Sequence, residues 1–439
     1  MIQILQPNQK VFAEASGVVC EIEHFLGSGG QGEVYKASLG GKSVALKWYY
    51  PNSATPHQRE ALEALIKAKP PDGRFLWPMD LVSAPGIQGF GYTMPLRDPR
   101  FKSIMDLMNR RVEPTFRALS KVGFNLADSF LQIHAKGWCY RDISYGNVFF
   151  DPQDGSVLVC DNDNIAVNGD KNCGVIGTPL FMAPEIVRRE ALPSTNTDLF
   201  SMAVLLFYIF MMHHPLDGKK EAAIHSLDDA AMAKLYGTDP VFIFDPNNDS
   251  NRPVLGIHDN ALIFWPLYPQ FLRDLFTRSF TEGIGNSENG RVRESEWRVS
   301  MVRLHDSIFY CPVCGAENFY DIEVLKANKG SPKSCWACKK EIKLPLRLRI
   351  GRNVIMLNRD TQIFRHHIDA QNGYDFSKAI AAVSRHPTNP QIWGLKNLSS
   401  EKWVAKLDGK EKDVVPGQSI SLTTGLRIDF GESEGEIRK

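Results

Sequence analysis

The sequence predicts an α+β fold in which strand-rich segments lie on both sides of a largely helical middle. Three observations support this prediction. Residues 18–48 alternate between strand patterns and glycine turns, residues 119–159 read as an amphipathic helix, a polar loop and a hairpin, and from Leu344 onwards apolar and polar residues alternate. A chain of 439 residues has room for about two or three domains.

The composition points away from two classes of partner. The chain has 51 Lys and Arg residues against 50 Asp and Glu residues, so neither nucleic acid nor a membrane surface is expected as a partner. The longest apolar run, residues 202–212, is too short to cross a bilayer and fits a buried helix. Because the first residues lack the features of a signal peptide and the cysteines suggest no disulfide framework, we expect a cytoplasmic protein.

The glycine-rich stretch at residues 27–32 separates two predicted strands. A dinucleotide-binding loop with this glycine spacing would open into a helix. Here the chain continues as a strand, turns at residues 40–41 and enters a third strand that carries Lys47. Since glycines let backbone N–H groups approach phosphates closely, this pattern predicts a phosphate-binding loop beside a lysine. The glycines in question are Gly27, Gly29 and Gly32.

The polar loop at residues 140–147 is the segment around which the rest of the chain is organised. It carries Asp142 and Asn147 and lies between the helix at 119–134 and a hairpin, after which comes Asp161. Two carboxylates and an amide oxygen suit phosphoryl transfer, because one carboxylate can accept the proton of a hydroxyl while the other two groups hold Mg²⁺. Taken alone, the loop has a simpler alternative, an Asp- and Asn-rich surface loop.

These segments, taken in order, resemble the motifs of eukaryotic-type protein kinases. The polar loop is similar to the catalytic loop, Asp161 to the metal-binding Asp of D-F-G, and residues 43–48 to the strand with the V-A-I-K motif. Residues 177–185 resemble the end of the activation segment, which closes in A-P-E. The resemblance covers about residues 18–304 and implies a bilobal protein-kinase fold.

The resemblance implies roles for the residues that match. Lys47 would pair with the α- and β-phosphates of ATP, while Val34 and Ala45 would pack on the adenine. A glutamate on the helix predicted from residue 56 would fix Lys47; Glu60 is the expected residue and Glu63 the alternative. The catalytic set is then Asp142, Lys47, Asn147, Asp161 and Glu60, with Asn147 and Asp161 as ligands of Mg²⁺ or Mn²⁺.

Two further matches concern support of the loop and the activation segment. Asp198 resembles the buried Asp that ties the apolar helix to the catalytic loop, and Arg291 resembles the late Arg that pairs with the A-P-E glutamate, here Glu185. Residues 164–177 contain no Ser, Thr or Tyr, so we predict activation without phosphorylation there, with Asp170 as a permanent partner of Arg141.

The sequence departs from the kinase pattern at three places. Tyr140 replaces the His of H-R-D, Ser144 replaces a lysine that contacts the γ-phosphate, and Asn162-Asp163 replaces Phe-Gly. The loss of that lysine removes one electrostatic term from the transition state. An ATP-binding pseudokinase scaffold is therefore the alternative function. A small-molecule kinase of the aminoglycoside type is a further one, against which the A-P-E segment argues.

Two C-x-x-C pairs predict a structural Zn²⁺ site, because thiolates on two tight turns form a closed tetrahedral set. The ligands are Cys311, Cys314, Cys335 and Cys338. The pattern resembles a zinc ribbon, with two disulfides as the alternative. The metal would supply folding energy that so short a segment lacks.

The C-terminal alternation predicts a small antiparallel β-sandwich. Residues 350–352, 365–368 and 393–399 resemble the phosphothreonine-binding forkhead-associated fold, but Phe364 and residues 400–403 depart from its motif. A docking module that does not read phosphate is thus the expected function, with phosphate binding through Arg352 as the alternative.

The prediction is a Ser/Thr protein kinase (EC 2.7.11.-) that uses ATP and acts on a protein substrate, with Thr178 lining the substrate groove. Its parts are an N-terminal extension at 1–17, an N-lobe at 18–95, a C-lobe at 96–304, a zinc ribbon at 305–343 and the sandwich at 344–439. The composite resembles bacterial kinases found alongside PP2C phosphatases and von Willebrand A-type proteins, which implies those partners.

Overall fold

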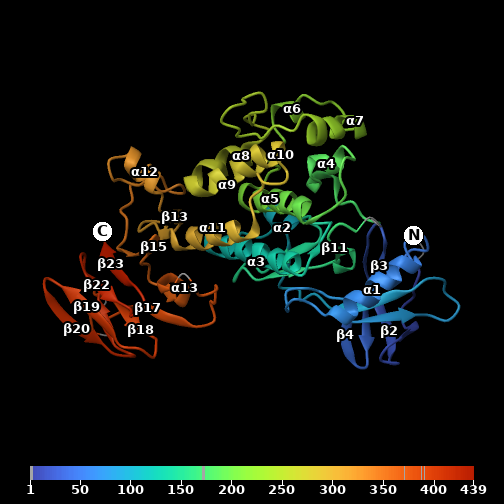
Figure 1. Cartoon of the computed structure of the whole chain (residues 1–439), viewed down its shortest axis with the longest axis horizontal. Coiled ribbons are helices and arrows are strands. Elements are labelled where there is room, and N and C mark those ends of the chain that lie inside the picture. Colours follow the sequence, from blue (N-terminus) through green and yellow to red (C-terminus); the bar gives the residue numbers. More distant parts are fainter. Residues whose placement is uncertain (1–2, 171–173, 370, 387, 390) are drawn as a thin grey trace. The chain divides into compact units, whose positions relative to one another are not determined.

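The computed structural model describes residues 3–170, 174–369, 371–386, 388–389 and 391–439. The chain divides into two compact units. Unit 1 comprises Met1–Phe264 and Leu275–Arg298, and unit 2 comprises Trp265–Asp274 and Val299–Lys439. The division therefore falls between Phe264 and Trp265 and inside helices α9 (Gln270–Phe280) and α11 (Glu294–Asp306), which Figure 1 labels. The domain boundaries drawn from the sequence stay a prediction.

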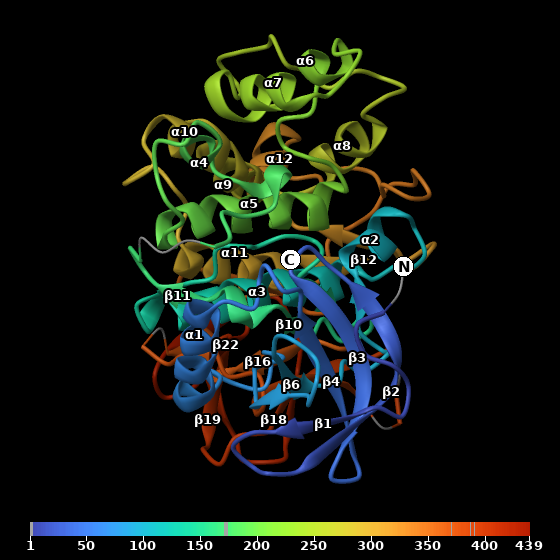
Figure 2. The ribbon, with the colours of Figure 1, turned by 90° about the vertical axis from the view of Figure 1, so that its right-hand side faces the viewer.

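Unit 1 begins with an N-lobe, a closed antiparallel barrel with the strand order β1-β2-β3-β4-β6-β5 (Figure 2). The strands are β1 (Lys10–Ala13), β2 (Val19–Ser28), β3 (Gly32–Leu39), β4 (Lys42–Tyr49), β5 (Asp80–Ser83) and β6 (Gly91–Pro95). The predicted run of strand, glycine loop, strand, turn and strand is confirmed by β2, β3 and β4. β1 lies in the segment set apart as an extension and pairs with β2 and β5.

Helix α1 (Pro56–Ala68) lies beside this barrel (Figure 2). It begins where the Thr55 side chain accepts a hydrogen bond from the backbone N–H of Gln58, and Pro56 occupies its first turn. Leu62 and Leu65 are its buried residues, so they define the face turned towards the protein.

The rest of unit 1 is the largely helical C-lobe. Helix α3 (Phe116–Ala135) and the apolar helix α5 (Thr195–Met211) pack together at its centre. Ser194 caps α5 in a reciprocal capping box with Thr197. The shorter helices are α2 (Ile104–Met108), α4 (Pro184–Val187), α6 (Lys219–Ala222), α7 (Asp229–Met232), α8 (Asp259–Phe264) and α10 (Glu282–Gly285).

The C-lobe strands frame the polar loop. β8 (Trp138–Cys139) precedes the loop, and the predicted hairpin is confirmed by β9 (Val148–Phe150) and β10 (Val157–Val159), in which Val148 pairs with Val159. β7 (Lys102–Ser103) pairs with β9, and β11 (Ala166–Val167) pairs with β8. The chain that follows β10 therefore returns beside the polar loop.

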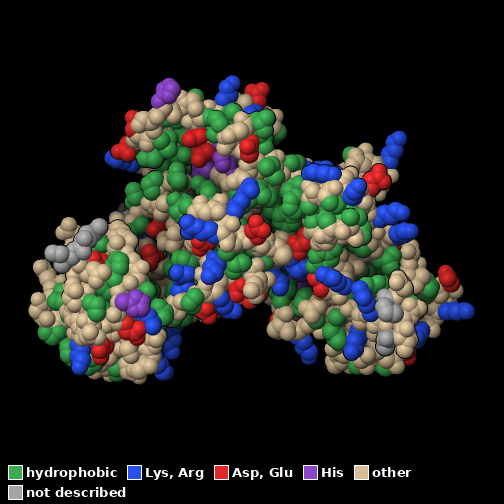
Figure 3. Space-filling view, turned by 180° about the vertical axis from the view of Figure 1, so that it is seen from behind, with side chains coloured by type: hydrophobic (Ala, Val, Ile, Leu, Met, Phe, Trp, Pro, Cys, Tyr) green, Lys and Arg blue, Asp and Glu red, His purple; other side chains and the backbone are tan. Residues whose placement is uncertain are grey.

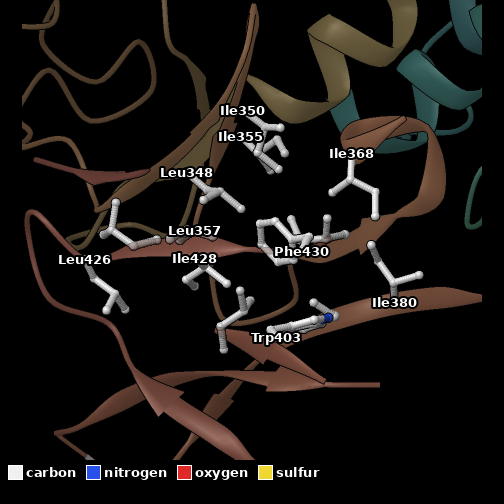
Figure 4. Close-up of a cluster of buried hydrophobic side chains, with 14 of the residues drawn as sticks. Leu348, Ile350, Ile355, Leu357, Ile368, Ile380, Trp403, Leu426, Ile428 and Phe430 are labelled. Carbon is white, nitrogen blue, oxygen red and sulfur yellow. The ribbon is translucent and has the colours of Figure 1, made fainter. Parts of the chain in front are cut away.

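Unit 2 contains a hairpin, a short helix and two antiparallel sheets. The hairpin is β12 (Ile308–Tyr310) with β13 (Glu317–Phe319), followed by α12 (Ile322–Ala327). One sheet has the order β15-β14-β23-β22-β19-β20 and the other β16-β17-β18-β21. Both sheets contribute to one buried apolar cluster, which includes Leu348, Ile363, Trp403 and Phe430 (Figure 4 shows most of it).

The strands of these sheets are short. They are β14 (Arg347–Ile350), β15 (Asn353–Met356), β16 (Gln362–Phe364), β17 (Ala379–Arg385), β18 (Trp393–Asn397), β19 (Trp403–Leu407), β20 (Lys410–Val414), β21 (Ser419–Ser421), β22 (Arg427–Asp429) and β23 (Glu434–Arg438), with α13 (Arg365–Ile368) after β16.

On the face seen in Figure 3, basic and acidic side chains are interspersed. Among the described residues, no helix combines the length and the apolar character needed to cross a membrane.

Candidate active site

Asp198, in the first turn of α5, holds the backbone of the polar loop. The carboxylate of Asp198 accepts the backbone N–H of Tyr140 at 2.5 Å and that of Arg141 at 3.0 Å. Arg141 has a φ of 74°, in the left-handed region that non-glycine residues avoid. Asp198, itself 1% exposed, therefore stabilises a backbone conformation that the loop would not adopt alone. The support expected of Asp198 is confirmed by these contacts.

A histidine lies behind Asp198. His134, near the end of α3, places Nε2 3.1 Å from Asp198 Oδ2, and its Nδ1 contacts the carboxylate of Glu294. Burial alone would lower the pKa of His134, but hydrogen bonds and charge from the two carboxylates raise it to about 9. The protonated imidazole of His134 thus offsets the charge of the buried Asp198. His134 was not selected from the sequence.

Tyr140 fills the position of the missing histidine. Its side chain is fully buried, its ring meets Phe130 edge-on, and its hydroxyl donates to the carbonyl of Cys160. Because Cys160 precedes Asp161, this bond ties the polar loop to the segment that carries the second carboxylate.

Asp142 is oriented through both of its oxygens. The hydroxyl of Thr178 donates to Oδ1 at 2.7 Å, and the amide nitrogen of Asn147 donates to Oδ2 at 3.0 Å and to the Asp142 carbonyl at 2.9 Å. Since the Asn147 nitrogen makes these bonds, its amide oxygen remains for a cation. The carbonyl of Asn147 accepts the N–H of Cys160 at 2.8 Å, which brings Asp161 beside the loop.

Asp161 also adopts a left-handed conformation, with a φ of 46°, and its side chain is 37% exposed. The turn after it is held by Asn162, whose amide nitrogen donates to the carbonyls of Leu76 at 3.0 Å and Val159 at 2.9 Å. Asn162 is fully buried. The residue that replaces Phe thus anchors the turn by hydrogen bonds to backbone carbonyls.

Lys47 reaches the same place from β4. Its ammonium lies 2.8 Å from Asp163 Oδ2, 3.6 Å from Asp161 Oδ1 and 3.2 Å from Gln31 Oε1. Burial would lower the pKa of Lys47, but the charges of Asp163 and Asp161 more than offset it, so the pKa is raised. The structure therefore gathers Lys47, Asp142, Asn147 and Asp161 at one site.

The structure does not bring Glu60 to Lys47. Glu60 is exposed, and Glu63, the alternative, pairs with Arg59. The physical reason is that α1 turns Gln58 towards the site, where its amide nitrogen donates to Tyr49 Oη at 3.0 Å and to the Asp163 carbonyl at 3.2 Å. The carboxylate that Lys47 contacts comes instead from Asp163, which replaces the motif's glycine and was not selected from the sequence.

The predicted glycines lie on β2, on β3 and in the loop between them, and the two residues predicted to pack on adenine lie on β3 and β4. A Cβ at Gly32 would lie 2.2 Å from the Trp48 carbonyl, so only glycine fits there, whereas Gly27 and Gly29 face open space. Val34 and Ala45 belong to one apolar cluster that also contains Leu158 of β10. Leu158 was not foreseen, although its place in the hairpin before Asp161 was a usable signal.

Two predicted ion pairs of the C-lobe are confirmed. Arg291 contacts Glu185 at 2.8 Å, and Arg141 contacts Asp170 at 3.2 Å. Part of the hydroxyl-free activation segment, residues 171–173, lies outside the described residues. Ser144, which stands in the polar loop at the position of the missing lysine, is buried.

The two C-x-x-C pairs of unit 2 form one cluster. Their Sγ atoms lie within 4.8 Å of one another, with 3.7 Å between Cys311 and Cys338 and between Cys314 and Cys335. Zn–S bonds of about 2.3 Å in a tetrahedron place sulfurs about 3.8 Å apart, whereas a disulfide needs about 2.05 Å. Burial works to raise the pKa of the Cys335 thiol, but backbone N–H groups and the Asn318 amide lower it to about 6. The group thus fits a metal and not two disulfides.

The residues that resemble a phosphate-binding module are only partly gathered. Arg352 is exposed at the turn between β14 and β15. His366 and His367 are buried, and His367 Nε2 lies 3.2 Å from Asp306 Oδ2. Arg365 pairs with Glu432.

Comparison with known proteins identifies part of this architecture. Residues 98–262 match the family model described as the protein kinase domain. Protein kinase YegI of Escherichia coli (strain K12) is 26% identical over 326 residues, which is 70% of this chain and 48% of that protein. CBL-interacting protein kinase 4 of Oryza sativa subsp. japonica is 28% identical over 188 residues, 40% of this chain and 39% of that protein.

A bacterial serine/threonine-protein kinase also matches. Pkn2 of Myxococcus xanthus is 28% identical over 210 residues, 44% of this chain and 24% of that protein. The chain thus spans less than half the length of these relatives. It carries a protein kinase domain, and with it the bilobal α+β kinase fold.

Proposed function

We propose that this chain is an ATP-dependent protein kinase that transfers the γ-phosphate to a Ser or Thr hydroxyl of a protein. The observation that carries the proposal is the meeting of Asp142, Asn147 and Asp161 on adjacent C-lobe loops with Lys47 from the N-lobe. The protein kinase domain and the names of the relatives support kinase function.

Asp142 is the proton acceptor in this reaction. As the substrate hydroxyl oxygen forms a bond to the γ-phosphorus, its proton passes to Asp142, the bond from that phosphorus to the β,γ-bridging oxygen breaks, and ADP leaves. Thr178 and Asn147 hold the two carboxylate oxygens, so the acceptor is oriented before substrate binds. The Lys47 ammonium binds the α- and β-phosphates.

The site also suits a divalent cation. The partly exposed carboxylate of Asp161 and the free amide oxygen of Asn147 are hard oxygen donors, which Mg²⁺ or Mn²⁺ prefers. These two residues would hold the ion, whose charge offsets that of the phosphates.

The test is incorporation of radiolabelled phosphate by purified wild type and by Asp142→Asn, each with Mg²⁺ or Mn²⁺. We expect loss of nearly all incorporation in Asp142→Asn, because asparagine cannot accept the proton. Equal incorporation in both proteins would refute the proposal.

An ATP-binding scaffold is the second candidate, and Ser144 favours it. In Ser/Thr kinases a lysine at this position contacts the γ-phosphate, and its absence here removes a cation from the transition state. If the chain is such a scaffold, the wild type would bind Mg-ATP and show no turnover.

The cysteine cluster is proposed as a structural Zn²⁺ site, since four thiol ligands leave no open position for chemistry. Cys311 and Cys335 belong to a buried cluster with Phe309, Ile342 and Met356, so the metal would hold β12 against the following sheet. Free thiols suit a reducing compartment such as the cytoplasm.

The C-terminal sheets are proposed as a docking module of forkhead-associated type that does not read phosphate, because Arg352 lacks the partners that would orient it. The expectation of a PP2C phosphatase or a von Willebrand A-type protein as partner rests on resemblance alone. A pull-down with the full chain, compared with an Arg352→Ala variant, would identify what binds and whether phosphate matters.

A further inference from the structure

Asp163 carries the contact that a kinase of the expected type would make from α1. Its side chain is 0% exposed, and its Oδ2 lies 2.8 Å from the ammonium of Lys47, whose side chain is 5% exposed. Among the described residues, the only other carboxylate within 4.0 Å of that ammonium is Asp161, at 3.6 Å. We infer that Asp163 positions Lys47 for the phosphates of ATP in place of a glutamate of α1. This inference rests on the proposed function and names a further residue of the same site.

The carboxylate of Asp163 is itself held in place. The hydroxyl of Tyr49, on β4, donates to the same Oδ2, and Gln58 of α1 donates both to that hydroxyl oxygen and to the Asp163 backbone carbonyl. The short turn at Asn162–Asn164 is anchored by the Asn162 amide. Asp163 is therefore fixed by β4, by α1 and by its own turn.

The hydrogen-bond inventory of Lys47 explains why this pair positions the ammonium and does not merely neutralise it. An ammonium has three N–H donors. One is directed to Asp163 and one to Gln31 Oε1 at 3.2 Å, which leaves one donor near Asp161. When Asp161 binds the cation, that third donor is available to a phosphate oxygen while Asp163 keeps the side chain in place.

Asp163 and Asp161 differ in burial, and so in how costly it is for each to lose its contact with Lys47. Separation of Lys47 from Asp163 would leave a fully buried charge unpaired, which is costly, whereas Asp161 is 37% exposed and can exchange partners cheaply. The Lys47–Asp163 pair is thus the persistent one. Helix α1 contributes an amide, Gln58, and needs no carboxylate.

The experiment measures the dissociation constants of Mg-ATP and of adenosine by calorimetry, with the full chain. Adenosine lacks phosphates, so a residue that acts through Lys47 affects only Mg-ATP. We expect Asp163→Asn to weaken Mg-ATP binding about ten- to a hundredfold and to leave adenosine binding unchanged. The rival anchor is tested by Glu60→Gln, which we expect to stay within about twofold of wild type for both ligands.

Two further variants keep the inference refutable. In a Lys47→Met background, Asp163→Asn should have no additional effect on Mg-ATP binding, because its partner is gone. Tyr49→Phe removes only the hydroxyl that holds Asp163, and we expect it to weaken Mg-ATP binding by about threefold. This variant tests the inference even if Asp163→Asn does not fold.

A larger loss of Mg-ATP affinity in Glu60→Gln than in Asp163→Asn would overturn the inference. An equal loss of adenosine and Mg-ATP affinity in Asp163→Asn would also overturn it. Wild type that does not bind Mg-ATP more tightly than adenosine would overturn it too. Failure of the proposed function gives a different result. Wild type and Asp142→Asn would then incorporate phosphate equally, while Asp163→Asn would still weaken Mg-ATP binding.

Discussion

His134 is the residue whose ionisation we expect to govern stability between neutral and alkaline pH. It lies between Asp198 and Glu294, and both carboxylates are buried. The test replaces it by His134→Gln, which retains hydrogen bonding but cannot carry charge. An exposed histidine, changed by His225→Gln, is the matched control.

The size of the stability change follows from the pKa of His134. The ordinary value of 6.5 describes the unfolded chain, and the two carboxylates raise the pKa of folded His134 to about 9. Because the folded state binds the proton more tightly, the stabilisation is complete below pH 6.5 and is lost as the pH rises through about 9. The rise in pKa corresponds to about 3 kcal/mol of unfolding free energy.

The assay is urea unfolding of wild type and both variants at pH 6 and at about pH 10, followed by the transition of the kinase domain. We expect His134→Gln to be less stable than wild type by about 3 kcal/mol at the lower pH and by much less at the higher pH. His225→Gln should match wild type at both. A His134→Gln deficit of the same size at both pH values would refute a charged His134.

Three other predictions concern the stability of the two units. Tyr140→Phe removes the donor to the Cys160 carbonyl and should destabilise unit 1 by about 1–3 kcal/mol in the same assay, with phosphate incorporation reduced. Removal of zinc by a chelator, or Cys335→Ser, should abolish the metal content measured by atomic absorption and lower the melting temperature; unchanged melting would argue against a structural metal. Arg291→Met leaves Glu185 without its partner and should cost about 3 kcal/mol, which the double variant with Glu185→Leu should partly restore.

The sequence placed Asp142, Asn147 and Asp161 together because their geometry is local. Asp142 and Asn147 lie on one loop, and Asp161 follows the adjacent hairpin, so a few connected elements bring them together. Lys47 and Asp163 are separated by 116 positions, and their contact exists only once β4 and the turn at Asn162–Asn164 are assembled. A carboxylate where the motif has glycine was the available signal.

The helical periodicity of α1 explains why Glu60 does not reach Lys47. Successive side chains on a helix are about 100° apart, so Gln58, Leu62 and Leu65 share one face, and Glu60 lies about 200° from Gln58. The buried Leu62 and Leu65 mark the inward face of α1. The phase of Glu60 relative to these two leucines therefore places it on the outward face of α1.

The departures from the kinase motifs differ in what they imply about catalysis. Tyr140 and Asn162 replace aromatic groups, yet each donates hydrogen bonds to buried backbone carbonyls that hold Asp161 in place. Asp163 replaces a glycine and supplies the carboxylate that Lys47 contacts. These three changes therefore preserve the geometry that phosphoryl transfer requires. Ser144 instead removes the charge that a lysine would place at the γ-phosphate, so a kinase and an ATP-binding scaffold differ in whether phosphoryl transfer proceeds without that cation.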